Sequence, residues 1–108
     1  MKRKELLIED DTIKIIEYKT KFLSLKETKK EFDIPVHLLK LVQKAYVDGE
    51  GTLSVAIFLE TEVEFLITHD EVENIDMIFE NLLDLKNRTN NSFRAELYNI
   101  ETKNTIDK

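Results

Sequence analysis

The 108-residue chain contains no cysteine, only two glycines and one proline, and no long run of apolar residues. The lack of cysteine excludes a disulfide framework, thiolate catalysis and cysteine-ligated zinc. Two glycines leave little material for a phosphate-cradling loop, and no P-loop, G-x-G-x-x-G or G-x-S-x-G motif occurs. No window approaches the roughly 20 apolar residues of a membrane-spanning helix. We therefore expect a protein without catalysis, metal, cofactor or membrane contact.

The composition that remains is typical of one folded, soluble domain. Apolar residues make up 42% of the chain and charged residues 35%, which is enough for a core beneath a solvated surface. Residues 1–108 are expected to form one α+β domain that frays at 1–11 and 102–108. Acidic residues follow the first lysines before any apolar run long enough for a signal peptide, so the cytoplasm is the expected location.

The net charge of −6 is distributed unevenly along the chain. Residues 12–46 hold eight lysines and four acidic residues, which gives a net charge of +4. Residues 47–108 hold five basic and fourteen acidic residues, which gives −9, and residues 1–11 contribute −1. This asymmetry predicts two surfaces of opposite charge.

The clearest secondary-structure signal is an amphipathic helix over residues 72–86. Its apolar residues recur at spacings of three and four, beginning with Val72, Ile75, Phe79 and Leu82. Asp70 and Glu73 form an Asp-x-x-Glu pattern that predicts capping of the first turn. Asn90 and Asn91 predict the end of the helix, since asparagine tolerates the left-handed backbone conformation found there.

Alternating apolar residues predict strands on both sides of this helix. Residues 52–68 hold two alternating runs around residues 60–62, which favours a hairpin, and residues 48–51 (Asp-Gly-Glu-Gly) form the expected turn before it. Ala56 and Phe58 on the second face of the first strand indicate that this strand is the more central one. Residues 93–100 (FRAELYNI) alternate again. Residues 52–100 are thus expected to form a ββαβ half in which the helix covers an antiparallel sheet.

The N-terminal half is ambiguous. Apolar residues at 6–8 and 13–16 flank Asp10 and Asp11, which favours a small hairpin up to about Tyr18. The 3-4-3 spacing of Ile15, Tyr18, Phe22 and Leu25 also suits one long helix, so this alternative stays open. A capping box that starts at Ser24 predicts a short helix over about 25–32, and Pro35 predicts a second helix over about 35–46.

Residues 24–43 resemble the helix-turn-helix of repressors and excisionases. The positions that pack the two helices of that motif together are matched by Phe32, Ile34, Leu39 and Val42. Lys29 departs from the pattern, because the family has alanine or glycine there so that the helices approach closely. The residues available for bases and phosphates are His37, Lys40 and Lys44, aided by Lys29 and Lys30. A DNA-binding regulator is therefore the alternative function, although an acidic chain fits it poorly.

A third arrangement follows if residues 35–47 form a strand. Strands followed by one amphipathic helix would then resemble a pleckstrin-homology-like domain. The FRAELYNI strand after the helix lies outside that pattern, and no ligand site of that family is carried over to this chain.

Acidic residues mark the strongest candidate for a binding surface. On the expected helix they recur at i, i+3, i+7 and i+11, which places on one face Glu73, Asp76, Glu80 and Asp84. Glu62 and Glu64 add negative charge on the hairpin. Such a face either keeps the protein soluble or docks a protein with a basic surface. We expect an adaptor, an inhibitor or an immunity-type factor that acts through protein–protein interaction, with homodimerisation left open.

Residues 69–71 (His-Asp-Glu) superficially suggest metal or acid–base chemistry. Their position at the start of the expected helix favours capping instead. The two histidines of the chain lie 32 residues apart, which gives no metal-ligand spacing.

Overall fold

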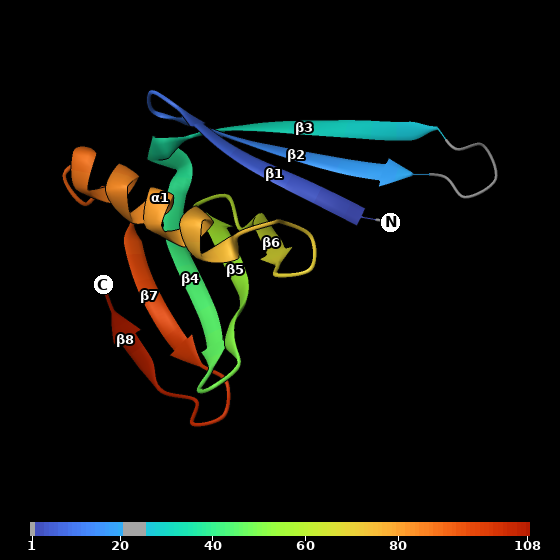
Figure 1. Cartoon of the computed structure of the whole chain (residues 1–108). Helices are drawn as coiled ribbons and strands as arrows, with labels where there is room; N and C mark the ends of the chain where they lie inside the picture. Colours follow the sequence, from blue (N-terminus) through green and yellow to red (C-terminus); the bar gives the residue numbers. More distant parts are fainter. Residues whose placement is uncertain (1, 21–25) are drawn as a thin grey trace.

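The computed structural model describes residues 2–20 and 26–108 as two β-sheets and one α-helix (Figure 1). The strands are β1 (Lys2–Glu9), β2 (Thr12–Thr20), β3 (Glu27–Pro35), β4 (Leu39–Val47), β5 (Gly51–Leu59), β6 (Glu64–Thr68), β7 (Arg94–Asn99) and β8 (Thr105–Asp107). One sheet has the order β1-β2-β3, and the other has the order β6-β5-β4-β7-β8. The predicted α+β class is confirmed for a small domain that is mostly sheet. Parts of the terminal segments that were expected to fray lie in β1 and β8.

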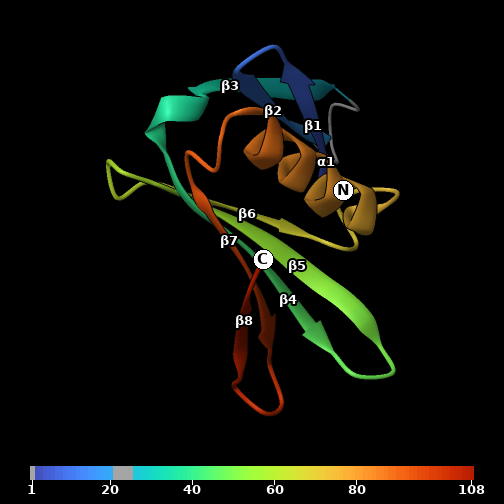
Figure 2. The ribbon, with the colours of Figure 1, turned by 90° about the vertical axis from the view of Figure 1, so that its left-hand side faces the viewer.

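Helix α1 (Ile75–Arg88) lies between the two sheets (Figure 2). Its buried side joins a single hydrophobic core through Ile75, Ile78, Phe79, Leu82 and Leu85. The three-stranded sheet contributes Ile13, Ile15 and Ile34 to that core, and the five-stranded sheet contributes Val42, Val55, Ile57 and Ala95 among others. Both sheets thus bury one face against the same helix, which gives a layered arrangement.

The hairpin predicted over residues 52–68 is confirmed as the antiparallel pair β5 and β6. Strand β5 is the central strand of the two, because it also pairs with β4, whereas β6 forms the edge of the sheet. The preceding turn is found where it was expected. Gly49 and Gly51 both have a φ of +86°, a left-handed conformation that glycine adopts without a steric penalty.

The predicted ββαβ half is not matched in detail. Strand β7 follows the helix as expected, but it pairs in parallel with β4 and not with the hairpin that precedes the helix. The five-stranded sheet is therefore mixed, and it depends on β4, a segment for which a helix was predicted.

The helix begins later than the sequence pattern predicted. Its N-cap is Asn74, whose side-chain oxygen accepts a hydrogen bond from the Met77 amide at 3.3 Å. The Glu71 carboxylate instead accepts from the Thr68 amide at 2.9 Å, so residues 69–71 belong to the turn that ends β6. Asn90 and Asn91 do adopt left-handed conformations after the helix, as predicted.

The two helices predicted over about 25–32 and 35–46 are wrong. Strands β3 and β4 occupy those segments, and only η1 (Val36–Leu38) forms a single 3-10 turn between them. The physical reason is strand pairing. Strand β3 pairs with β2 over its whole length, and this pairing sets Phe32 opposite Ile15 and Ile34 opposite Ile13. Tertiary contacts of this kind override local helix propensity. Ser24, the first residue of the expected capping box, lies outside the described residues.

The helix-turn-helix resemblance is overturned by the same pairing. Phe32 and Ile34 lie on β3, while Leu39 and Val42 lie on β4, and all four contribute to the core between sheet and helix. The predicted N-terminal hairpin is confirmed as β1 and β2, so the single long helix through Ile15 and Tyr18 is excluded. The strand that the pleckstrin-homology-like alternative required within residues 35–47 is present as β4, but β7 and β8 follow α1 and lie outside that pattern.

Lys4 connects the three-stranded sheet to the rest of the domain. Its ammonium donates to the Leu66 carbonyl oxygen at 2.6 Å and lies 3.2 Å from the Glu71 carboxylate, and its amide donates to the Glu71 carbonyl oxygen at 2.9 Å. The rings of Phe32 in β3 and Phe65 in β6 meet edge to face with centroids 5.1 Å apart. A polar clamp and an aromatic pair therefore hold the two sheets together.

Replacing the buried Leu82 with alanine tests the central role of α1. Because the Leu82 side chain is fully buried, Leu82→Ala should lower the free energy of unfolding by about 2–5 kcal/mol. Met77→Ala on the exposed side of the same helix should change it by less than about 0.5 kcal/mol. Urea denaturation followed by circular dichroism measures both values. Equal effects of the two variants would contradict the proposed packing.

Candidate protein-docking surface

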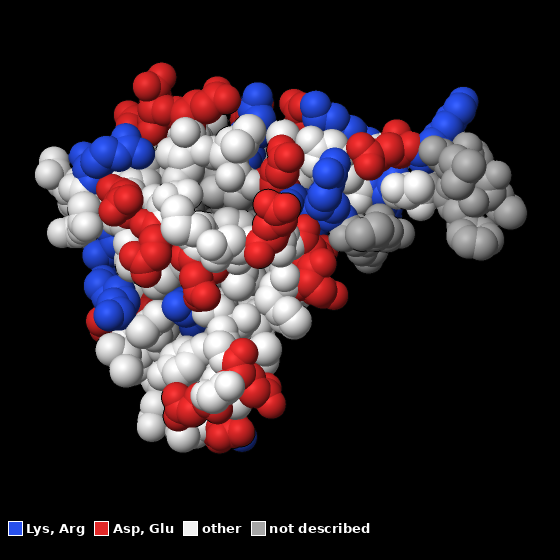
Figure 3. Space-filling view, in the orientation of Figure 1, with Lys and Arg blue, Asp and Glu red and all other residues white. Residues whose placement is uncertain are grey.

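Three of the four acidic residues predicted on one helix face lie in α1, and the fourth lies directly before it. We call Glu73, Asp76, Glu80 and Asp84 the acidic stripe. All four are exposed, and Glu73 lies just ahead of the N-cap because the helix begins later than expected. Figure 3 shows acidic side chains spread over the face of the molecule where α1 lies. The burial of Ile78, Phe79 and Leu82 forces the opposite side of the helix outward.

Asp76 differs from the rest of the stripe because it is bonded to the sheet. The Thr52 hydroxyl donates to its Oδ1, and the Lys44 ammonium lies 3.1 Å from the same oxygen. The hydrogen bond from Thr52, followed by that from Lys44, holds the pKa of Asp76 below its ordinary value of 3.8. Asp76 therefore anchors the first turn of α1 to β4 and β5.

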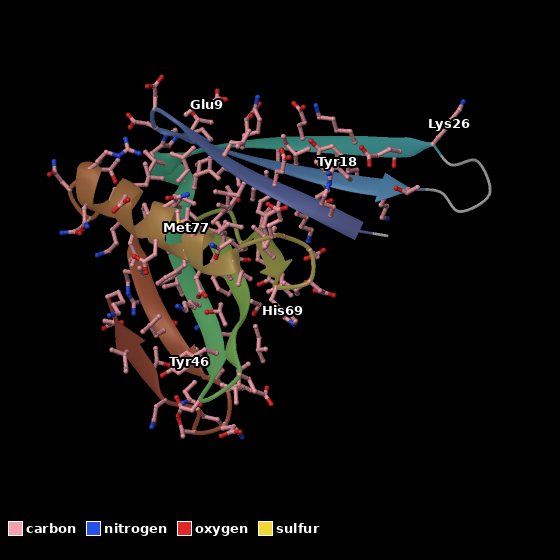
Figure 4. The ribbon with its side chains drawn as sticks, in the orientation of Figure 1. Glu9, Tyr18, Lys26, Tyr46, His69 and Met77 are labelled. Atoms are coloured by element: carbon pink, nitrogen blue, oxygen red, sulfur yellow. The ribbon has the colours of Figure 1, made fainter. Side chains whose placement is uncertain are left out.

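A shallow hollow of about 390 Å³ adjoins this anchor. It lies on the helix side of the five-stranded sheet and is lined by Lys44, Tyr46, Gly51, Thr52, Asp76 and Leu97. Figure 4 shows Tyr46 on the part of the sheet that extends past the helix. The Lys44 ammonium also lies 5.6 Å from the centre of the Phe79 ring. Its charge is thus engaged within the chain.

Met77 is the apolar member of the exposed helix face. Its side chain is 52% exposed, between Asp76 and Glu80 in sequence (Figure 4). Methionine adapts its shape to many partners and is common in protein-binding surfaces. The sequence prediction overlooked this residue, although an apolar residue at a polar position of the helix pattern was a usable signal.

The two acidic residues of the hairpin, Glu62 and Glu64, do not lie on the same surface as the acidic stripe. Glu62 lies in the turn between β5 and β6, where it adopts a left-handed conformation with a φ of 68°. Glu64 lies opposite Phe58 in β5, and Phe58 lies opposite Leu41 in β4. This row occupies the sheet face directed away from α1, because the next row, centred on Ile57, is buried beneath the helix. Glu64 therefore lies on a different surface.

The basic residues of the alternative function do not form one patch. His37 is exposed in η1, Lys40 is exposed at an irregularity of β4, and Lys44 is paired with Asp76. Lys29 and Lys30 are neighbours in β3 and so point to opposite faces of the sheet. Lys29 lies 2.7 Å from Glu31, whose hydrogen bond raises the pKa of the lysine.

A basic hollow at the free end of the three-stranded sheet was not predicted. It has a volume of about 320 Å³ and is lined by Arg3, Lys4, Glu17, Tyr18, Lys19, Thr28, Lys29, Lys30 and Glu71. Strand register places Lys4, Lys19 and Lys30 on the inner face of the sheet, where Glu17 and Glu71 both lie near Lys4. Arg3 and Lys29 lie on the outer face and pair with Glu27 and Glu31. Strand pairing gathers these residues from β1, β2 and β3, and the sequence alone does not reveal that register.

Comparison of the chain with protein-family models, with curated proteins and with solved structures finds no match. In the part of the chain that the structure describes, no three histidine or acidic side chains are grouped so that they could hold a metal ion. The helix found at residues 75–88 is too short to cross a membrane.

Removing the charge of Asp76 tests its role as an anchor. Because the folded-state pKa is lowered, the carboxylate stabilises the fold above its ordinary pKa, and this effect is lost as the pH falls through the lowered value. Asp76→Asn should thus be less stable than the natural chain at about pH 7, and the difference should shrink as the pH falls below 3.8. Urea denaturation over a pH series measures this change.

Asp84→Asn provides the matched control, since Asp84 is exposed on the same helix and forms no ion pair with a described residue. A pH-independent difference between Asp76→Asn and the natural chain would show that the carboxylate is not the stabilising group.

Proposed function

We propose that the protein acts without catalysis, by binding a protein with a basic surface at the acidic stripe. The observation that carries this proposal is the arrangement of Glu80 and Asp84 around the exposed Met77. Neither carboxylate forms an ion pair with a described residue, so both are available to a partner. Adaptors, inhibitors and immunity-type factors can all act through such a surface.

The physical division of roles within the stripe supports the same proposal. Exposed carboxylates attract a basic surface over a distance of about 8 Å at physiological salt, which speeds association. Met77 supplies the apolar area that excludes water at short range. Asp76 holds the start of the helix in place, so the surface is pre-formed.

Site-specific crosslinking tests the proposed surface. A photo-reactive residue at the exposed position Asn81 should capture a basic partner in cells, and the same residue at the exposed position Glu101 should not. With the captured partner purified, Glu80→Lys combined with Asp84→Lys should weaken binding by roughly tenfold or more, about 1.4 kcal/mol. Undiminished binding of this double variant, or binding insensitive to salt, would contradict the proposal. Asp76 is left unchanged because its loss would also disturb the fold.

The basic hollow supports a second function, the binding of a nucleic-acid backbone. Lys19 and Lys30 are exposed there, and neither pairs with an acidic side chain among residues 2–20 and 26–108. Phosphate contacts of this kind are strongest at low salt and carry no sequence specificity. Of the residues that the sequence suggested for DNA binding, Lys30 is retained in this second function. The second function does not require a helix-turn-helix.

Retention on heparin and on duplex DNA at about 50 mM salt tests this second function. The natural chain should bind, and Lys19→Glu combined with Lys30→Glu should abolish retention. Lys40→Glu combined with Lys103→Glu changes the net charge equally at exposed positions outside the hollow, and should leave retention largely intact. A natural chain that flows through at low salt would eliminate the nucleic-acid function.

A further inference from the structure

The five-stranded sheet has one face without a second layer among the described residues. Helix α1 and the three-stranded sheet lie on the same side of it, and no element of residues 2–20 or 26–108 crosses the other side (Figures 1 and 2). Sheets that carry apolar residues on a face normally bury that face against another element. The composition of the open face therefore matters.

Strand register places apolar side chains across this open face. One row runs across β6, β5, β4 and β7 as Glu64, Phe58, Leu41 and Arg94. The next row contains Leu66, Ala56, Gln43 and Glu96, and a third contains Thr68, Ser54, Ala45 and Tyr98. Leu66 is 52% exposed, and Phe58 and Leu41 are partly exposed, so large apolar side chains of this face contact water in the isolated chain.

The polar pair in the middle of the face is already satisfied within the chain. The Gln43 side-chain amide donates to the Glu96 carboxylate at 2.6 Å, and Glu96 is only 9% exposed. A second layer could therefore cover this pair without leaving it lacking a hydrogen-bond partner. The centre of the face can therefore be buried at little cost. A surface rich in unpaired charges could not, because those charges would lose their hydration.

Opposite charges occupy the two ends of the first row. Glu64 is exposed and forms no ion pair with another described residue. Arg94 is 70% exposed and lies 3.7 Å from Glu96 and 3.6 Å from Asp107, both beyond normal hydrogen-bond distance. Its guanidinium therefore retains donors for a further carboxylate. An apolar row with an acid at one end and a base at the other is complementary to its own reverse.

We propose that a second copy of the chain covers this face, related by a twofold axis that lies between the sheets and runs parallel to the strands. This operation reverses each row, so that Glu64 meets the partner's Arg94 and Phe58 meets the partner's Leu41. In the second row Leu66 lies opposite the partner's Glu96, whose carboxylate already accepts a hydrogen bond from Gln43 of its own chain. A twofold interface of this kind uses the same patch on both copies. Stacked sheets approach to about 10 Å, which suits side chains of this size. Because α1 lies on the other face, the dimer leaves both acidic stripes accessible, and the inference is independent of the function proposed above.

Charge exchange between the row ends tests the dimer. Sedimentation should give about twice the chain mass of 12.7 kDa for the natural protein. Glu64→Arg alone and Arg94→Glu alone should each weaken dimerisation by at least about tenfold, because each places like charges opposite one another. An equimolar mixture of the two variants should dimerise again, since the arginine introduced in one copy then faces the glutamate introduced in the other. The double variant with both exchanges should also dimerise on its own.

Two further variants separate this surface from the others. Phe58→Asp should be monomeric yet folded by circular dichroism, and Glu80→Lys combined with Asp84→Lys should remain dimeric because the stripe lies on the opposite side of the sheet. A natural chain that stays monomeric at all concentrations would overturn the proposal. So would folded single variants whose mixture fails to dimerise, or a dimer that is lost on reversal of the stripe.

Discussion

The burial of one helix between two sheets is the constraint on which the rest of the structure depends. Phe79, Leu82 and Leu85 are at most 1% exposed, and they contact a core to which both sheets contribute. The inner face of each sheet packs against this helix, and the two sheets also meet directly through Phe32 and Phe65 and through Lys4. The apolar side of α1 also fixes which residues face outward. The acidic stripe is exposed because the opposite side of the helix cannot leave the core.

Elements whose partners are close in sequence could be predicted, and elements with distant partners could not. The hairpin of β5 and β6 and the helix after it follow from alternation and from the 3.6-residue period. Strands β3 and β4 were not predicted, because Phe32, Ile34 and Leu39 fit the spacing of a helix as well as that of a strand. Only pairing with β2, and with β5 and β7, decides between the two. The late start of α1 has a similar cause, since the Glu71 side chain is used by Thr68 to close β6.

The candidate surface, like the fold, could be predicted only where it depends on residues that are close in sequence. Helical periodicity alone places Glu80 and Asp84 on one face, and the structure keeps them there. It also separates Asp76 from them, because its hydrogen-bond partner Thr52 lies 24 residues away and is brought close only by the fold. Glu64 was grouped with the stripe by charge, yet strand register assigns it to the open sheet face. The sequence therefore shows which residues are charged, while strand register determines on which surface each of them lies.

The two proposed surfaces use different forces, and α1 keeps them apart. Carboxylates on the stripe act over a longer range but contribute little once screened by salt. The open sheet face offers apolar area, which is insensitive to salt and requires close packing. A twofold pair formed through the sheets would carry one stripe on each outer side. A partner with two basic sites could then engage both at once, and the second contact would be strengthened by the effective concentration that the first creates. Individually weak electrostatic contacts would in this way yield stable binding without any large apolar surface on the helix.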